Sequence, residues 1–521
     1  MANKGNNYND IPLPVPTEGI ILETTLSHYV SPEGAVSYAE NFHFDTIGKI
    51  TSRQPIRQIT NLNNHGLSSG SDGRAMIYAP SSSAYIVWNE SGTLKYCAAD
   101  GTGSVTSIAS AFTSTMKDMD ILQNLLIWAN GTGSQPKYFN GSTVSTIAGT
   151  SFPTTSDFNL ISAGFVGRVW IAASADTNNR VYYSDVIPSG GLASLTGGSN
   201  YISVNPNNTD TIRALIRTQN CLFVFTNNSI YRIYSTQSVD NSPCANVGTP
   251  SFKSVTEAKD GIYFYHTSGI YRLSEDGSAV EISQRIRDFI NRVNPLYTPT
   301  EISAWSDDNH VYFSFSGVLN SSSGNAPILG YPNDRCYIAA YTISTQTWTI
   351  YSILGANINQ VAATNPNYTG TLGAGVDSSP LTVLFLTDTS GNTIGGTYNN
   401  INLISGGTDT PNDCGLSPIS VRCETNWQTF GSETHLKRIS GISVASENAA
   451  GIDIGYIIDK DGTNNLKHIG SLSSEYITLY RDFQSVEFNR IKFIITGNVT
   501  TPVTIGQITI IGLDDLGYKY N

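Results

Sequence analysis

The stretch that decides the fold of this chain is Gly261-Ile-Tyr-Phe-Tyr265, followed after a short polar turn by Gly269-Ile-Tyr-Arg-Leu273. An aromatic-rich run and a second run built on tyrosine, with a turn between them, are typical of two paired β-strands. The same pattern recurs in Leu125–Ala129 with Lys137–Phe139, Arg168–Ala172 with Arg180–Tyr183, Cys221–Phe225 with Ser229–Ile233, and His310–Phe315 with Cys336–Tyr341. The first runs begin at residues 125, 168, 221, 261 and 310, so successive copies lie 43, 53, 40 and 49 residues apart. A period of about 40 to 50 residues with several short strands predicts a β-propeller.

The composition indicates an all-β chain. Its 521 residues would suggest about three domains by length alone, but the blades of one propeller share a single closed structure. Only 13% of the residues are charged, while 47 Gly and 28 Tyr are present together with many Ser, Thr and Asn. Neutral polar side chains on strands and turns, and not Lys and Glu on helices, therefore face the solvent.

The net charge of −12 bears on the class of partner. It argues against tight binding of nucleic acid by a surface that neutralises phosphates. It does not argue against nucleic acid that passes nearby, because an acidic wall repels phosphates and so avoids holding them.

The cysteines indicate no zinc or redox motif, and the start of the chain indicates no membrane-spanning segment. The six cysteines include no Cys-x-x-Cys pair, and Cys221 and Cys336 lie within strand runs, so we expect buried free thiols. The first residues are polar, and no run of 18 apolar residues occurs. We therefore expect no membrane-spanning segment, and synthesis and assembly in a host cytoplasm.

The sequence divides into three regions. Residues 1–34 predict an extended N-terminal arm that lies along a neighbour or is a disordered leader, because Ile11-Pro-Leu-Pro-Val-Pro16 favours polyproline II. Residues 35–414 predict the propeller, and the strand-like segment 35–59 is the candidate that closes it by pairing with the last blade. The fragments give six or seven blades, and about six are favoured because the N-terminal strands would complete a blade and not add one. Residues 415–521, where longer alternating strands replace the aromatic repeat, predict a C-terminal antiparallel β-sandwich.

One segment within the propeller has a helical period. Apolar residues at 282, 286, 289, 290 and 293 predict a short amphipathic helix over 283–293, with Ser283 as its N-cap. We expect this inserted helix to pack on the flank of the propeller, and a contact with another subunit is the alternative.

Motifs for metal binding or nucleotide chemistry are lacking. The seven histidines have no spacing that sets two ligands on one helix face, and neither a Gly-x-Ser-x-Gly elbow nor a phosphate loop occurs. Asp459-Lys-Asp-Gly462 resembles the start of a calcium loop, but Gly470 stands where a Glu is needed, so a tight hairpin is predicted. Tyr341 to Trp348 resembles the outer hairpin of a kelch blade, in which Tyr and Trp are buried anchors.

The acidic residues need separate consideration, because glycosidases work with a pair of carboxyl groups and, in propellers, these lie at the mouth of the central channel. Asp118 and Asp120 could face the same way on one strand, and Asp307-Asp308 stand directly before an inner strand. Aspartates in turns also bond local backbone amides, and we favour this structural role. We therefore predict no enzymatic activity, no catalytic, cofactor-binding or metal-binding residue, and no cofactor.

A set of strand segments carries a resemblance to a known family. The segments are Asn41–Pro55, Gly167–Ala172, Asn179–Asp185, Tyr201–Val204, Thr211–Leu215, Leu222–Phe225 with Ser229–Ile233, Gly269–Leu273 and Ile282–Ile286. Their arrangement resembles the tail nozzle proteins of short-tailed bacteriophages, which are also called tail hub or stabilisation proteins. The similarity covers roughly residues 35 to 350 and is a pattern of strand segments, not a single motif.

The resemblance implies a structural protein of the virion tail. Such subunits usually assemble as six copies into a ring below the portal and adaptor proteins, with tail fibre or spike proteins beside or below. The ring continues the channel through which double-stranded DNA leaves without sequence recognition, and it would retain the genome before infection. The C-terminal sandwich would then decorate or join neighbouring subunits. The family pattern supplies no catalytic residue, and this chain is shorter than many nozzle proteins, which puts their tip or fibre-docking insertions in doubt.

Two other functions stay open from the residues alone. One is a carbohydrate-binding or carbohydrate-cleaving propeller, and such an enzyme should lose turnover when Asp118, Asp120 or Asp308 is changed to Asn. The other is a kelch-like protein-interaction propeller, which should remain monomeric in every context. A nozzle protein should show no turnover and should occur in symmetric, stoichiometric amounts within particles.

Overall fold

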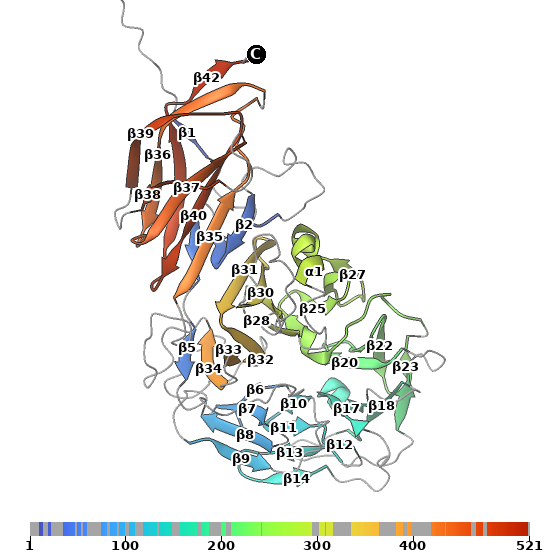
Figure 1. Cartoon of the computed structure of the whole chain (residues 1–521). Coiled ribbons are helices and arrows are strands. Elements are labelled where there is room, and N and C mark those ends of the chain that lie inside the picture. Colours follow the sequence, from blue (N-terminus) through green and yellow to red (C-terminus); the bar gives the residue numbers. More distant parts are fainter. Residues whose placement is uncertain are drawn as a thin grey trace, which may run out of the picture.

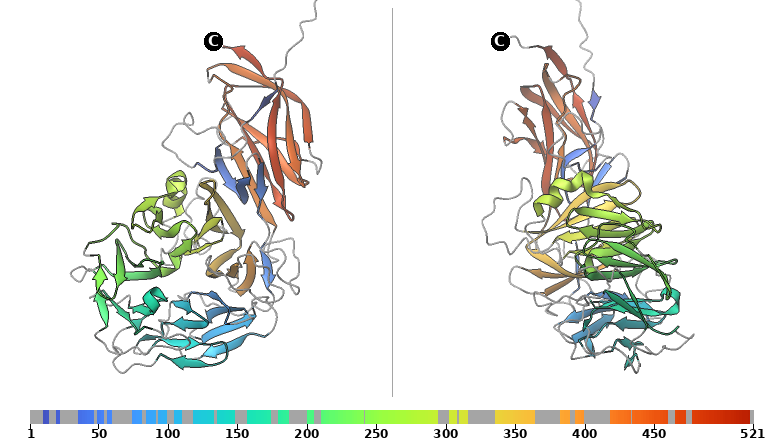
Figure 2. Two further views of the ribbon diagram at one scale, coloured as in Figure 1. Left: turned by 180° about the vertical axis from the view of Figure 1, so that it is seen from behind. Right: turned by 90° about the vertical axis from the view of Figure 1, so that its right-hand side faces the viewer.

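The structure, a computed structural model, is built almost entirely of strands (Figure 1, Figure 2). It describes residues 10–13, 19–21, 35–46, 49–53, 56–59, 74–80, 84–90, 93–98, 104–109, 118–132, 135–147, 157–173, 179–186, 200–204, 210–240, 242–293, 302–307, 309–315, 335–363, 382–388, 393–398, 418–432, 434–459, 465–472 and 477–518. The expected all-β class is confirmed.

Within these residues, six four-stranded antiparallel sheets form separate propeller blades. The first three are β6 (Met76–Tyr78), β7 (Tyr85–Glu90), β8 (Thr93–Ala98) and β9 (Thr106–Ala109); β10 (Met119–Leu122), β11 (Leu125–Trp128), β13 (Lys137–Phe139) and β14 (Val144–Thr146); and β16 (Leu160–Ala163), β17 (Val169–Ala172), β18 (Arg180–Tyr183) and β19 (Tyr201–Ser203). The others are β20 (Ile212–Arg217), β21 (Leu222–Thr226), β22 (Ile230–Ser235) and β23 (Ser238–Val239); β24 (Val255–Ala258), β25 (Gly261–His266), β26 (Gly269–Leu273) and β27 (Ala279–Glu281); and β32 (Ala356–Ala363), β33 (Thr382–Asp388), β34 (Thr393–Tyr398) and β5 (Arg57–Ile59). A two-stranded ribbon of β12 (Gly131–Thr132) and β15 (Asp157–Phe158) lies between the second and third blades along the chain.

A further set of four strands completes the ring between β24 and β32. It comprises β28 (Ser303–Ser306), β29 (His310–Phe315), β30 (Arg335–Thr342) and β31 (Thr347–Leu354). Its inner strand β28 contacts the inner strands β24 and β32 on either side. The propeller of about six blades is therefore confirmed, and this seventh four-stranded unit differs from the six separate blades because its sheet continues into the C-terminal module.

The five aromatic strand pairs of the sequence form the second and third strands of their blades, as the pairing of β25 with β26 illustrates. All of these strands have a partner on both sides. The second strands are also buried on both faces, which explains why their sequences are almost continuously apolar. Tyr341 and Trp348 anchor the hairpin of β30 and β31 as expected: Trp348 is fully buried and its indole N–H donates to the Ile282 carbonyl at 2.9 Å.

The propeller closes by pairing an early strand with the last blade. β5 lies antiparallel to β34, with Ile59 opposite Gly395, so one strand from residues 35–59 completes the blade as predicted. Such a closure joins both ends of the ring without any covalent bond.

The other strands of that early segment belong elsewhere. β2 (Val36–Glu40) pairs with β31 and with β35 (Ile419–Thr425), while β3 (Phe42–Thr46) and β4 (Lys49–Ser52) join the C-terminal strands through β41 (Thr504–Ile511). The expected start of the propeller at residue 35 therefore does not follow the strand pairing. Residues 36–52 alternate like any half-buried strand, and apart from the β3–β4 hairpin their partners lie more than 300 residues later, so no local pattern marks where they belong.

The C-terminal module contains two antiparallel sheets. One consists of β3, β4, β41, β36 (Leu436–Glu447) and β39 (Ile477–Phe488), with β1 (Ile11–Pro12) on β41 and β42 (Asp514–Gly517) on β36. The other extends from β2 and β35 through β40 (Ile491–Val499) and β37 (Ile452–Ile458) to β38 (Lys467–Ser471). Buried side chains of both sheets form one hydrophobic cluster, which also includes residues of β1 to β4. The sandwich expected over 415–521 thus differs in its limits, because N-terminal strands supply part of both sheets.

One nine-stranded sheet joins the propeller to this module. Its order is β28, β29, β30, β31, β2, β35, β40, β37 and β38, so it extends from the propeller axis to the far edge of the module. Figure 1 and Figure 2 show the module standing on the rim of the propeller beside β31, with the C-terminus at the end remote from the blades. The chain is therefore one elongated body.

A buried polar cluster stabilises the junction. Arg53 is only 1% exposed, and its guanidinium donates to Asn41 Oδ1 at 2.8 Å and to the Ser352 carbonyl at 2.7 Å. The Asn41 amide in turn donates to the Ser420 carbonyl at 2.6 Å. Asn41 has a φ of 62°, a conformation that Asn tolerates better than most residues. Propeller strand β31, the early strands and β35 are thus tied by one set of hydrogen bonds.

The predicted helix is present. A 3-10 turn, η4 (Ser283–Ile286), leads into α1 (Arg287–Val293). Phe289 is 1% exposed and packs edge-on against Phe315 with ring centroids 5.4 Å apart, which supports the packing role. Ser283 is not the N-cap: that position is Ile282, and the Ser283 hydroxyl accepts from Ile270 N–H at 2.9 Å instead. Ser283 is already the first residue of the 3-10 turn, one position after the N-cap.

Among the cysteines that the structure describes, all are free. Cys97, Cys221, Cys336 and Cys423 are buried, as expected, and Cys244 is half-buried.

Candidate functional site

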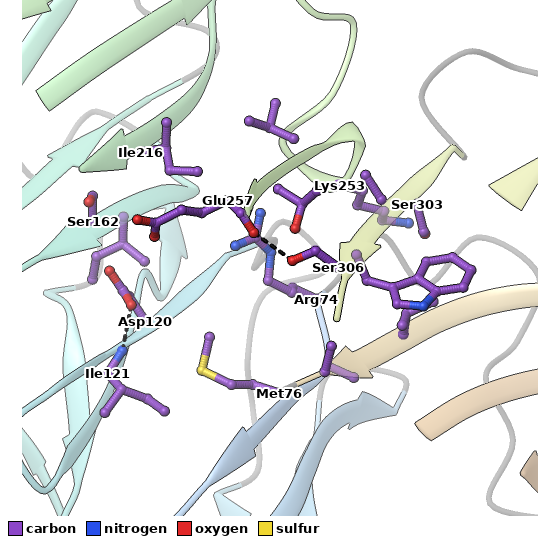
Figure 3. A pocket seen from close by; sticks show the side chains of 18 of the residues that line it. Arg74, Met76, Asp120, Ile121, Ser162, Ile216, Lys253, Glu257, Ser303 and Ser306 are labelled. Carbon is purple, nitrogen blue, oxygen red and sulfur yellow. Dashed lines mark hydrogen bonds between the residues drawn. The ribbon is translucent and has the colours of Figure 1, made fainter. Parts of the chain in front are cut away.

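A cavity of about 360 Å³ lies along the propeller axis. Its walls come from the inner strands β6, β10, β16, β20, β24, β28 and β32, as Figure 3 shows for several of their side chains. The inner strand of a blade has a partner on one side only, and its other side faces the axis. Charged and hydroxyl side chains therefore gather here, on strands that are otherwise apolar.

Arg74 lines this cavity and contacts two other blades. It stands directly before β6, and its guanidinium donates to the Phe252 carbonyl at 2.7 Å while its Cζ lies 5.4 Å from the centre of the Phe252 ring. Phe252 begins η3 (Phe252–Ser254), the turn before β24 on the far side of the ring. The Arg74 Nε also lies 3.5 Å from Asp118 Oδ1. One arginine thus links three blades across the axis.

Asp118 and Asp120 face the neighbouring blade from the same strand. Asp118 accepts from its own neighbour Met119 N–H at 3.0 Å and from Ile161 N–H of β16 at 3.3 Å. Asp120 accepts from Ile121 N–H at 2.7 Å and, through its other oxygen, from a second β16 amide, that of Ala163, at 2.7 Å. Inner strands of adjacent blades do not pair through their backbones, so these carboxylates supply hydrogen bonds between the second and third blades. Asp118 and Asp120 therefore bond backbone amides, which is the structural role expected from the sequence.

The pKa values of both carboxyl groups are raised, which favours their protonated forms. Burial raises the pKa of Asp118 to about 6, with the Arg74 guanidinium acting in the opposite direction. Burial likewise raises the pKa of Asp120, opposed mainly by the Arg217 guanidinium. Both carboxyl groups are held in place by backbone amides, and a guanidinium group lies near each of them. Neither is placed as a free nucleophile.

Other charged and aromatic groups complete the lining. Arg217 comes from β20, Lys253 from the turn before β24 and Glu257 from β24 itself, so both cations and carboxylates line the wall. The Ser306 hydroxyl donates to the Glu257 carbonyl at 2.5 Å, a second hydrogen bond between adjacent blades (Figure 3). Trp305 stacks on Tyr312 with ring centroids 5.2 Å apart, and among the described residues its buried indole N–H has no hydrogen-bond partner.

The second acidic pair does not join the first. Asp307 is outside the cavity lining, and it accepts from the backbone N–H of His310 at 2.7 Å and from the Tyr312 hydroxyl at 2.7 Å. Burial acts to raise the pKa of Asp307, but the hydrogen bonds from His310 and Tyr312 lower it below its usual range. Asp308 lies outside the described residues, as do residues 460–462 of the Asp459 loop.

The sequence did not single out Arg74, Arg217, Lys253 or Glu257 as parts of the site. Each is a charged residue inside or next to a short inner strand. That position would have indicated a side chain that faces the propeller axis. The propeller period locates blades well, but inner strands such as Val255–Ala258 are short and half-polar, so their charges resemble those of ordinary turns.

The described part of the chain has neither a cluster of metal ligands nor a membrane-spanning helix. No group of three or more His, Cys, Asp or Glu side chains is arranged to hold a metal ion there. No described helix has the length and apolar character needed to cross a membrane.

Comparison with known proteins gives distant matches only. No protein-family model and no curated protein matches this sequence. Among solved structures, a streptogramin B lyase is 14% identical, with 65% of this chain and 99% of that chain covered and a TM-score of 0.41. Virginiamycin B lyase from Staphylococcus aureus is 13% identical, with 67% and 100% covered and a TM-score of 0.40. The Pan2 WD40 domain of Neurospora crassa is 9% identical, with 64% and 92% covered and a TM-score of 0.36.

Proposed function

We propose that this chain is a structural subunit of a bacteriophage tail, which forms a ring-shaped nozzle around the exit channel for double-stranded DNA. Six copies would form the ring below the portal and adaptor proteins, retain the genome before infection and release it during ejection. The chain would be made in the host cytoplasm and would reside in the virion tail. It would have no enzymatic activity.

The observation that carries this proposal is the nine-stranded sheet between propeller and C-terminal module. A continuous sheet leaves no flexible linker, and the Arg53 cluster adds buried hydrogen bonds at the junction. A rigid, elongated subunit suits a tube that must keep its bore under load. A propeller that only presents a binding surface has no need of this connection.

The axial cavity supports the same proposal by its size. A volume of about 360 Å³ leaves no room for a duplex within one subunit. DNA would therefore pass between subunits, along their outer surfaces. The net charge of −12 suits such a wall, because it would repel phosphates.

The test is cryo-electron microscopy of particles made by the genome that encodes this chain. A closed ring of propellers on the tail axis is the expected result. A peripheral spike position, or absence of the chain from particles, would contradict the proposal.

A ligand-binding propeller is the second candidate, because one observation favours it. The cavity has the volume of a small-molecule site, and Asp120, Lys253 and Glu257 line it together with the aromatic Trp305, as a site for sugar hydroxyls would require. This candidate predicts that a bound sugar raises the melting temperature of the native chain and not of Lys253→Met, whereas the nozzle proposal predicts no sugar effect on either.

A further inference from the structure

One arginine at the wall of the axial cavity has no counter-ion. Arg217 is the last residue of β20 and lines the cavity. Within the part of the chain that the structure describes, its guanidinium forms neither a hydrogen bond nor an ion pair. Arg74, by contrast, donates to the Phe252 carbonyl at 2.7 Å and lies 3.5 Å from Asp118. The Arg217 guanidinium is therefore available to an anionic group from outside the chain.

A glycine of the neighbouring blade determines where this guanidinium lies. Gly164, in the turn after β16, has a φ of +100°, and a Cβ at this position would come within 3.1 Å of Arg217 Nη1. The Arg217 side chain thus packs against the third blade, although β20 belongs to the fourth. Its positive charge therefore lies at the boundary between these two blades, beside the cavity.

The nearby carboxyl group of Asp120 does not use up this charge. Burial raises the pKa of Asp120, and the Arg217 guanidinium opposes that effect, so the two groups are within electrostatic reach. The described side chains of Asp120 and Arg217 nevertheless form no ion pair, and the Asp120 oxygens accept from the Ile121 and Ala163 amides instead. The fork of N–H donors on Arg217 remains open.

Three hydroxyl groups of the wall are open in the same way. They belong to Ser162 of β16, Thr256 of β24 and Ser303 of β28, which are inner strands of three different units of the ring. Figure 3 shows Ser162 and Ser303 at two sides of the pocket, where they are 2% and 5% exposed. Among the described residues, none of the three hydroxyls has a hydrogen-bond partner. Buried polar groups normally have one, so this wall suits a ligand with several hydroxyls of its own.

We infer that the axial cavity binds a sugar acid, that is, a monosaccharide with a single carboxylate. The carboxylate would accept from the Arg217 guanidinium, and the sugar hydroxyls would bond the three open hydroxyls of the wall. A volume of about 360 Å³ lies at the lower end of the range for small-molecule sites. Asp120 and Glu257 also line the cavity, so a second negative charge on the ligand would be repelled. This inference rests on the ligand-binding candidate and names its ligand.

The test is isothermal titration of the full-length chain with glucuronate, glucose and glucose 6-phosphate at one ionic strength. Glucuronate should bind about 10- to 100-fold more tightly than glucose, which lacks the group that Arg217 recognises. Glucose 6-phosphate should bind more weakly than glucuronate, because it carries more negative charge into a cavity that already holds carboxylates.

Arg217→Met should lower the affinity for glucuronate by the same factor and leave the affinity for glucose unchanged. Arg213→Met is the matched control and should bind glucuronate like the native chain. Arg213 belongs to the same strand, but it donates to Asn227 Oδ1 at 2.7 Å and does not line the cavity. Thermal melting without ligand shows whether both variants fold, and the comparison of sugars on the native chain decides the matter without any variant.

The possible results separate this inference from the function on which it rests. Equal affinities for glucose and glucuronate, or full glucuronate binding by Arg217→Met, would overturn the sugar acid and leave a ligand-binding propeller standing. If no sugar binds the native chain, the ligand-binding candidate fails and the sugar acid fails with it, while the nozzle proposal stands.

Discussion

The buried carboxylate of Asp118 connects two blades, and its ionisation in the folded chain costs free energy. Its two oxygens accept amides from β10 and β16, while Arg74 lies beside it. Burial raises its pKa from 3.8 to about 6, so the folded chain binds this proton more tightly than the unfolded chain. The contribution of Asp118 to the free energy of unfolding should therefore be fully present below about pH 4 and should be lost as the pH rises from about 4 to about 6.

Asp118→Asn should flatten this part of the stability profile. The difference between 3.8 and about 6 corresponds to on the order of 3 kcal/mol, which the native chain loses over that interval and the variant does not. Urea midpoints measured at pH 4, 5, 6 and 7 check this. Asp276→Asn is the matched control, since that side chain is exposed and only bonds its own turn. An Asp118→Asn profile as steep as the native one would contradict the assignment.

Arg74→Met should destabilise the propeller at neutral pH. It removes the hydrogen bond to the Phe252 carbonyl and leaves the Asp118 carboxylate without its cation, a loss of about 1.5 to 3 kcal/mol. Arg272→Met is the control, because its ion pair with Asp260 is more exposed and should contribute less than about 1 kcal/mol. Combining Arg74→Met with Asp118→Asn should cost less than the sum of the single changes. Additive losses would show that the two side chains do not interact.

At the scale of elements, α1 is a short helix whose apolar side chains complete a core otherwise built of strands. Its buried residues join the cluster that contains blade strands β29 and β30 and both sheets of the module. Phe289 contacts Phe315 and, with ring centroids 5.9 Å apart, Tyr337. The helix therefore seals the flank beside the junction.

Phe289→Ala should cost about 3 to 5 kcal/mol, because it leaves a cavity between aromatic rings. Gln284→Ala, on the exposed side of η4, should stay within about 0.5 kcal/mol of the native chain. Chemical unfolding of both variants measures the contrast. A small effect of Phe289→Ala would favour the alternative, in which the helix serves a contact with another subunit.

The sequence predicted the elements that are buried on both sides and missed those defined by distant partners. The runs around Tyr263 and Tyr271 became the central strands of a blade, because aromatic burial leaves a local pattern. Segment 36–52 was placed in the propeller, since nothing in Val36–Glu40 shows that its partner is β35. The two aspartates of β10 were found from their alternation, whereas Arg74 was not, because its role depends on Phe252 across the axis.

At the scale of the whole molecule, the N-terminal strands and the C-terminal module should be inseparable. A chain of residues 1–414 retains Val36, Phe42 and Ile50, which are at most 2% exposed in the complete protein, but lacks the sheets that cover them. We expect it to aggregate. A chain of residues 56–414 lacks these strands and keeps β5, so only the propeller side of the junction, such as Ile350 of β31, loses its cover, and we expect it to aggregate less. Light scattering and thermal melting compare the two, and a soluble 1–414 chain would contradict the shared module.

The long-range closure also sets when this protein can fold during its synthesis. Ile59 cannot pair until Gly395 has been synthesised, 336 residues later. Ile50 cannot pair until Ile505 has been synthesised, 455 residues later. At about 5 to 20 residues per second, the ribosome takes on the order of tens of seconds to deliver these partners. Throughout this time the nascent chain has an open blade and an uncovered sheet edge. We therefore expect only finished polypeptides to become competent for assembly, and prematurely terminated ones to be excluded without any dedicated proofreading factor.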